Sequence, residues 1–224
     1  ILLYGARQVG KTTLSKALLA KHGNPKDYYL CEHPAVREIL NTQAPERIRQ
    51  FIGSAKLIVL DEAQVIPEIG KILKLLHDTY PDLQIIATGS SSFDLANKLS
   101  EPLTGRAIQF MLYPISLTEL ESRWSRIDIK TRLPNFLIYG TYPGILELPE
   151  QDQKTLLHNL TEQYLHKDLL MFESLQNSEK ILRLIKLLAL QLGSEVSIHE
   201  LAQQLGISRT TVERFLDLLQ KMFI

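Results

Sequence analysis

Residues 5–12, GARQVGKT, combine two glycines, a lysine and a threonine at the spacing of a phosphate-binding loop, the Walker A motif. The glycines let backbone N–H groups converge on phosphate oxygens, and a helix that begins at the end of the loop adds favourable partial positive charge. Lys11 is expected to contact the β- and γ-phosphates, and the Thr12 hydroxyl to ligate Mg2+. A chance glycine turn is disfavoured because an apolar run precedes the loop and a helical pattern follows it. The residues expected to contact the nucleotide here are Gly5, Ala6, Arg7, Gln8, Val9, Gly10, Lys11, Thr12 and Thr13.

A second chemical motif follows further along the chain, where the apolar run LIVL ends in Asp61 and Glu62. A strand of this kind presents a carboxylate at its tip, and beside a phosphate-binding loop that carboxylate holds Mg2+ through the waters of the ion. Asp61 is therefore the candidate metal residue together with Thr12. Glu62 points elsewhere and is the candidate for polarising the water that attacks the γ-phosphate. For an Asp-Glu pair alone, a solvated strand end or a helix cap is the alternative, and the upstream loop argues against it.

Polar residues also follow the next predicted strand, in the segment IIATGSSS. Thr88, Ser90 and Ser91 would lie beside the strand that carries Asp61, and we take Ser90 as the candidate that senses the γ-phosphate or orients the water. Helix capping by a serine remains the alternative. Arg106, in LTGRAIQF, is a candidate for stabilising the charge that develops on the phosphate, within one chain or across a subunit boundary. A surface arginine without that role fits the sequence nearly as well.

Two later motifs are less specific. In YGTYPGIL, Tyr142 and Pro143 offer an aromatic ring and a rigid ring on which an adenine could pack, and a plain interdomain turn explains the motif equally. In YLHKDLL, His166 and Asp168 fall on an amphipathic helical pattern, which favours a solvated face over catalysis.

The elements that must position these residues alternate between strand and helix patterns. Five apolar runs predict strands, at residues 1–4, 28–32, 56–62, 83–89 and 107–113. Their nearly continuous Ile, Leu and Val content is typical of a parallel sheet that is covered by helices on both faces. Helical spacing predicts crossover helices in TTLSKALLAKHG and in residues 67–81. The sequence therefore predicts an α/β fold whose loop and acidic pair meet at the carboxyl edge of a five-stranded parallel sheet.

From about Pro149 onward the pattern is helical throughout. We place the domain boundary there, which gives an α/β domain at residues 1–148 and an all-α domain at residues 149–224. The last part, residues 197–224, predicts a helix-turn-helix that turns at Gly206 and is truncated before the wing of a winged helix.

The charge of this last segment bears on its partner. In a DNA reader, the residues facing the major groove would be Arg209, Thr210, Thr211, Glu213 and Arg214. Residues 197–224 nevertheless contain three basic and three acidic side chains, so the segment lacks the basic surface that binds phosphate backbones. Packing, self-association or contact with a protein partner is therefore favoured over DNA binding.

Composition restricts the remaining choices. The chain has 224 residues, 45% of them hydrophobic, and its 25 basic and 25 acidic side chains cancel, which fits two modest domains without a strong attraction for polyanions. Cys31 is the single cysteine and cannot form an intramolecular disulfide, so a cytoplasmic location is expected. No apolar run is long enough to span a bilayer, and we expect a soluble chain without a membrane partner.

Taken in order, the motifs LYGARQVGKTTL, LIVLDEAQ, ATGSSS, LTGR, YGTYPGI and YLHKDL, followed by the helix-turn-helix, resemble a family of bacterial and archaeal AAA+-type ATPases. Its members carry a C-terminal domain of unknown function with a winged-helix element. The resemblance implies ATP binding at Gly10, Lys11 and Thr12, with Asp61 and Glu62 as the metal-holding and hydrolytic pair. It also suggests a relationship to the signal-transduction ATPases, in which a Gly and Pro motif lies against the nucleotide.

Two departures from the family pattern concern that motif. Many members have a second glycine where this chain has Thr141, and an acidic residue where it has Gly144. The hypothesis that follows is a conformational switch driven by binding and hydrolysis of ATP with Mg2+. A nucleotide-responsive DNA regulator is the alternative, and a phosphoryl transferase is a lesser one because LDEAQ supplies a glutamate suited to activating water.

Overall fold

The computed structural model describes residues 1–89, 103–172, 175–221 and 223. It divides the chain into two compact units, residues 1–125 and residues 126–222. This division comes earlier than the boundary expected near Pro149. The helices on either side of the YGTYPG segment, α7 (Arg126–Tyr139) and α8 (Pro143–Leu146), both contact the long helix α9 (Glu150–Phe172), so they belong with the helices that follow.

The first unit is built on a five-stranded parallel sheet in the order β2-β3-β4-β1-β5. All five predicted strands are present, and they are β1 (Leu2–Tyr4), β2 (Tyr28–Leu30), β3 (Leu57–Asp61), β4 (Gln84–Gly89) and β5 (Gln109–Met111). The predicted α/β fold is thus confirmed. Because every strand runs the same way, the segments that follow β1, β3 and β4 all emerge at one edge of the sheet.

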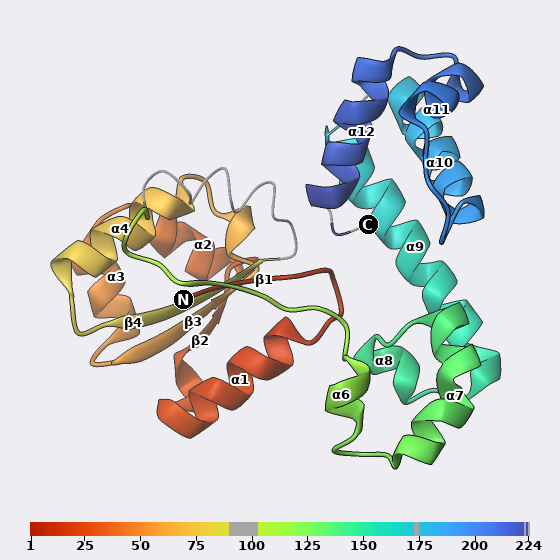
Figure 1. The fold of residues 1–224 in the computed structure, drawn as a ribbon. Helices are drawn as coiled ribbons and strands as arrows, with labels where there is room; N and C mark the ends of the chain where they lie inside the picture. Colours follow the sequence, from red (N-terminus) through yellow and green to blue (C-terminus); the bar gives the residue numbers. More distant parts are fainter. Residues whose placement is uncertain (90–102, 173–174, 222, 224) are drawn as a thin grey trace. The chain divides into compact units, whose positions relative to one another are not determined.

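Helices cover both faces of this sheet, as Figure 1 shows. The helices and short 3-10 turns of the unit are α1 (Lys11–His22), η1 (Pro25–Asp27), α2 (Pro34–Asn41), α3 (Pro45–Ile52), η2 (Ala63–Val65), α4 (Ile69–Thr79) and α6 (Leu117–Leu120). Of these, α1 lies on one face, and α2, α3 and α4 lie on the other.

Strand β3 shows why both faces must be covered. Its side chains alternate between the faces, so Leu57 and Val59 pack with Leu19 of α1, whereas Ile58 and Leu60 join the larger core under α2 to α4. All five residues of β3 are buried. A strand buried on both faces reads as one continuous apolar run, which is the pattern that identified it in the sequence.

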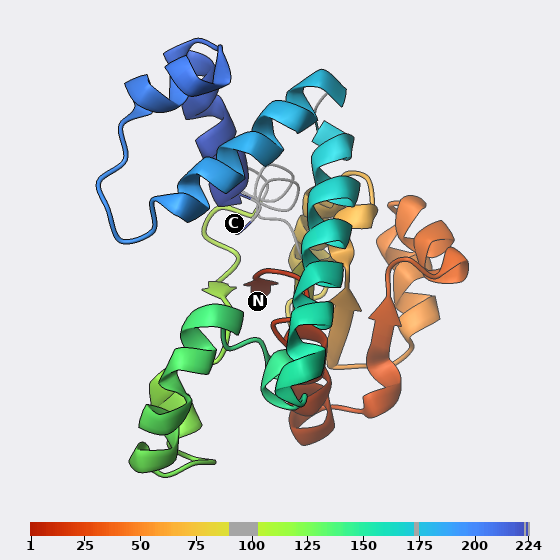
Figure 2. The same cartoon turned by 90° about the vertical axis from the view of Figure 1, so that its right-hand side faces the viewer.

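The second unit is helical throughout its described residues. After α7, α8 and α9 come α10 (Leu175–Leu190), α11 (Ile198–Leu205) and α12 (Arg209–Lys221). Figure 2 shows the last three helices gathered together, and their shared core includes Leu184, Leu201 and Phe215. Gly206 ends α11 in the left-handed conformation, with φ at 63°, which gives the predicted turn between the two helices. Among the described residues, no helix combines the length and apolar character needed to cross a membrane.

Candidate functional site

The loop predicted to bind phosphate lies between β1 and α1. Strand β1 ends at Tyr4, and helix α1 begins at Lys11 directly after Gly10. Gly10 has a φ of 101°, in the left-handed region where a side chain is disfavoured, and Gln8 also has a positive φ of 60°. The backbone therefore reverses direction through residues 5–10, and the N-terminus of a three-turn helix faces the loop.

Gly5 is required by packing. A β-carbon at this position would lie 2.2 Å from the carbonyl oxygen of Leu112, at the end of the neighbouring strand β5. The backbone N–H of Leu112 donates to the carbonyl of Tyr4 at 2.7 Å, so the two segments cannot separate without losing a hydrogen bond. The glycine thus lets the loop start against the last strand of the sheet.

Lys11 is almost completely buried, with 5% of its surface exposed. Its ammonium donates to the carbonyl oxygens of Gly5 and Ala6, at 2.9 and 2.7 Å. Burial lowers the pKa of Lys11 to about 8, although the negative charges of Glu62 and Asp61 act in the opposite direction. The side chain therefore lies folded into the loop, as a donor whose present acceptors are neutral carbonyl groups.

Asp61 ends β3 and is 2% exposed. Its Oδ2 accepts a hydrogen bond from the Thr12 hydroxyl at 2.8 Å and another from the Tyr28 hydroxyl, and its Oδ1 accepts one from the Thr88 hydroxyl. A buried carboxylate is costly without such donors. Hydroxyl groups from α1, β2 and β4 thus stabilise Asp61 beside the first turn of α1.

Glu62 follows Asp61 with a φ of 54°, which turns its side chain away from the direction of the strand. Its backbone N–H donates to the Thr88 hydroxyl at 3.2 Å, and its carboxylate accepts a hydrogen bond from the Gln64 amide. Thr88 therefore links the two acidic residues, since it also donates to Asp61. The Asp61 carboxylate thus accepts from hydroxyl groups, and the Glu62 carboxylate accepts from an amide.

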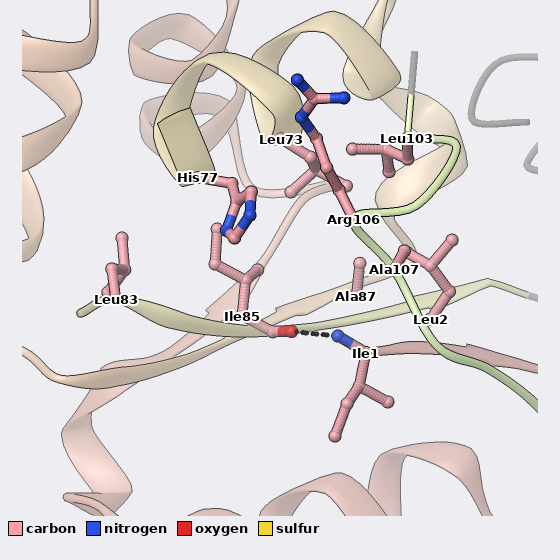
Figure 3. Close-up of a pocket in the computed structure, with 10 residues that line it drawn as sticks. All are labelled: Ile1, Leu2, Leu73, His77, Leu83, Ile85, Ala87, Leu103, Arg106 and Ala107. Carbon is pink, nitrogen blue, oxygen red and sulfur yellow. Dashed lines mark hydrogen bonds between the residues drawn. The ribbon is translucent and has the colours of Figure 1, made fainter. Parts of the chain in front are cut away.

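Arg106 is not brought to the loop of its own chain. It precedes β5 and so lies at the amino edge of the sheet, whereas the loop and Asp61 lie at the carboxyl edge. Figure 3 shows Arg106 above Ile1, which precedes β1, and above Ile85, which lies near the start of β4. Its guanidinium forms an ion pair with Asp78 of α4 at 2.9 Å and is partly exposed. Arg106 therefore lies at the opposite edge of the sheet from the loop of its own chain, and its role toward a nucleotide stays a prediction.

The roles predicted for the other residues stay predictions. Ser90 and Ser91 lie outside the described residues. Tyr142 and Pro143 begin α8 in the second unit, so the adenine contact is not tested by the geometry of the loop. His166 and Asp168 fall within α9, in a part whose side chains are not described.

Two polar residues of this region were not predicted from the sequence. In the sequence, Tyr28 is an aromatic residue at the start of a predicted strand, which is an ordinary position for it. Gln64 ends the motif LDEAQ, in which only the two acidic residues have a predicted role. Tyr28 becomes visible only once β2 is known to pair with β3, because the prediction did not include the order of the strands.

The residues that meet here suit a phosphate chain and a hard cation. Backbone N–H groups at a helix start and a buried ammonium favour phosphate oxygens. A carboxylate and a hydroxyl 2.8 Å apart are oxygen donors of the kind that Mg2+ prefers. Glu62, beside them, is a carboxylate that can accept a proton.

Comparison with known protein families also divides the chain into two parts. A family model described as an AAA domain matches residues 1–121, and a second, described as a domain of unknown function (DUF8612), matches residues 130–224. The interval between the matches contains the division that the contacts place after Ser125.

Relatives with similar sequences cover nearly the whole chain. MJ1637, an uncharacterized protein of Methanocaldococcus jannaschii, is 27% identical over 99% of this chain and 54% of that protein. Rv2008c, an uncharacterized protein of Mycobacterium tuberculosis, is 28% identical over 98% of this chain and 47% of that protein. The chain thus spans about half the length of these relatives.

A solved structure shares the fold. The Walker-type ATPase PABY2304 of Pyrococcus abyssi matches with a TM-score of 0.63 and 18% identity, over 99% of this chain and 84% of that chain. At this identity the likeness establishes the fold alone, and function must be argued from the residues of the site.

Proposed function

Since this chain belongs to the AAA domain family, we propose that it binds ATP together with Mg2+ and hydrolyses the bond to the γ-phosphate. The observation that carries this proposal is the hydrogen bond of 2.8 Å between Thr12 and Asp61. It joins the two predicted metal residues, which are 49 positions apart in the sequence, at the first turn of the helix that follows the loop. Burying a carboxylate costs free energy, and a turn that binds no ligand would not require one at this position.

Each residue then has a defined task. Lys11 exchanges the carbonyls of Gly5 and Ala6 for the β- and γ-phosphate oxygens, which carry charge and are stronger acceptors. Thr12 and Asp61 hold Mg2+, which neutralises the negative charge of the phosphates when it is bound. Glu62 accepts a proton from the attacking water, and Gln64 holds its carboxylate in the free protein.

Binding is tested by replacing Lys11 with alanine. We expect Mg·ATP to raise the melting temperature of the wild-type chain and to leave that of Lys11→Ala unchanged, because the variant loses the buried ammonium. Differential scanning fluorimetry in the presence and absence of Mg·ATP measures both. Equal responses of wild type and variant, or no response of either, would contradict the proposed binding.

Hydrolysis is tested separately with Glu62→Gln. This variant keeps the size of the side chain and removes the group that takes the proton, so ATP binding should persist while phosphate release falls by about 100-fold or more. Glu46→Gln, on an exposed position of α3, is a matched control and should leave turnover unchanged. If Glu62→Gln hydrolysed ATP at the wild-type rate, Glu62 would not be the base.

We further propose that nucleotide turnover serves as a conformational switch, with the helical unit as the part that contacts a protein partner or a second copy. Arg106 enters this proposal only across a subunit boundary, because it lies away from its own loop. Mixing Arg106→Ala with Glu62→Gln should then restore hydrolysis that neither variant shows alone. If Arg106→Ala alone hydrolysed ATP at the wild-type rate, or if the mixture were no more active than its two components, Arg106 would keep only its ion pair with Asp78.

A further inference from the structure

Tyr28 occupies a position beside the predicted metal residues that neither sequence motif includes. Its hydroxyl donates to Oδ2 of Asp61, the same oxygen that accepts the hydrogen bond from Thr12. The Thr88 hydroxyl donates to the other oxygen, Oδ1. Rotation of the carboxylate is thus opposed by three hydrogen bonds that come from three different elements, β2, α1 and β4.

The ring of Tyr28 is held in place independently of its hydroxyl. Residue 28 pairs with Val59, two positions before Asp61 on β3, so the length of the tyrosine side chain is needed to reach the carboxylate. The ammonium of Lys16, one turn into α1, lies 4.4 Å from the centre of the ring. The ring also packs against the cluster formed by Leu19, Val59 and Ile86. A phenylalanine would keep these contacts and remove only the hydroxyl.

We infer that Tyr28 is a positioning residue for the cation site: its hydroxyl keeps Oδ2 of Asp61 turned toward Thr12, so that carboxylate and threonine hydroxyl face one ion. This inference rests on the proposed function, since an ion at Thr12 and Asp61 is part of it. Pre-orientation of this kind is what partner groups behind a metal ligand supply, and their loss commonly weakens metal binding by about 10- to 100-fold. In the proposed site the phosphate contacts are assigned to Lys11 and to the loop backbone, and none is assigned to Tyr28.

The test separates the cation from the phosphates. ATP is titrated by calorimetry into wild type, Tyr28→Phe and Tyr29→Phe, once with EDTA and once with Mg2+. Tyr29 is the matched control, because it is the next residue of β2 and its ring packs against Phe51, with the centroids 5.4 Å apart. In EDTA all three proteins should bind ATP within about twofold of one another. With Mg2+, Tyr28→Phe alone should bind about tenfold more weakly, which is the effect of losing one hydrogen bond to a charged group.

The other outcomes have distinct meanings. If Mg2+ strengthens ATP binding to the same degree in Tyr28→Phe as in wild type, the positioning role is wrong and the proposed function stands. If Tyr28→Phe loses affinity equally in EDTA and in Mg2+, with an unchanged circular dichroism spectrum, Tyr28 supports the loop in general and the inference is also overturned. If Mg·ATP does not bind to the wild type, the proposed function fails and this inference fails with it.

Discussion

At the scale of the residue, the site is dominated by two charges that have been removed from water. Lys11 and Asp61 are both nearly inaccessible, yet each has the partners that a buried charge requires. The partners of Lys11 are two backbone carbonyls, and those of Asp61 are three hydroxyls. Because these are neutral groups, a phosphate and a cation can replace or join them with a gain in electrostatic energy.

The pKa of Lys11 predicts how ATP affinity depends on pH. Burial lowers this pKa to about 8 in the free protein, and bound phosphates would favour the protonated form and raise it. At pH 7 and below the ammonium is already mostly protonated, and the lysine contributes little pH dependence. Above pH 8, binding must take up a proton, so affinity should fall by up to about tenfold for each pH unit until the pKa of the complex is reached.

Calorimetry in two buffers of different ionisation enthalpy measures this proton directly. Uptake should approach one proton at pH 9 and be close to zero at pH 7 for the step assigned to Lys11. The same titration of Glu62→Gln is a useful control, because it retains Lys11 while removing one of the two carboxylates that raise its pKa. An affinity that is constant from pH 7 to 9.5 would show that Lys11 is not the group whose protonation the phosphates require.

At the scale of the element, the loop is placed by the contact of its first residue with β5. Gly5→Ala would bring a methyl group to 2.2 Å from the backbone oxygen of Leu112, where no rotation of a side chain can relieve the overlap. We expect a loss of about 3 kcal/mol in the free energy of unfolding, at the upper end for overpacking. Urea denaturation followed by circular dichroism measures it.

Gly206→Ala is the matched control for this prediction. Gly206 lies in the left-handed region, with φ at 63° and ψ at 40°, and a β-carbon there would meet nothing within 4 Å. Its replacement should cost about 1 kcal/mol, which is the backbone term alone. If the two variants were equally stable, the contact between Gly5 and β5 would not be what fixes the start of the loop.

The sequence was most informative where one local pattern determines the structure. The apolar runs predicted the five strands because both faces of the sheet are buried, and the spacing of Gly5, Gly10 and Lys11 predicted a loop at the start of a helix. Asp61 was found for the same reason, since it ends a buried strand. The bond from Tyr28 to Asp61 was missed because it depends on which strands are neighbours, and a single sequence does not state the order of strands.

The predicted boundary near Pro149 differs from the observed division for a related reason. The glycine and proline residues of YGTYPGILELPE predict a linker. In the structure, Gly140 follows the last residue of α7 and Pro143 begins α8. Pro143 takes the first position of α8, where a proline is favoured. What assigns α7 and α8 to the second unit is their contact with α9, and contacts between helices leave no mark on local composition.

At the scale of the whole molecule, two separate hydrophobic cores imply two cooperative unfolding transitions. The sheet unit is organised around residues such as Ile58 and Ile72, and the C-terminal helices around Leu184 and Phe215. All residues that we assign to the phosphates and the cation belong to the first unit. Ligand binding stabilises the folded state of the part that binds, by about 2.7 kcal/mol at a concentration of 100 times Kd.

Scanning calorimetry of the full chain should therefore show two transitions, of which Mg·ATP raises one by several degrees. The Lys11→Ala variant should show both transitions with no shift, which separates specific binding from a general effect of the solute. If Mg·ATP instead raised both transitions in the wild type together, the nucleotide would stabilise the helical unit as well. That result would favour the predicted contact of Tyr142 and Pro143 with the adenine, because those residues begin α8 in the second unit. A shift confined to one transition would leave the phosphates and the cation, held by residues of the sheet unit, as the source of the stabilisation.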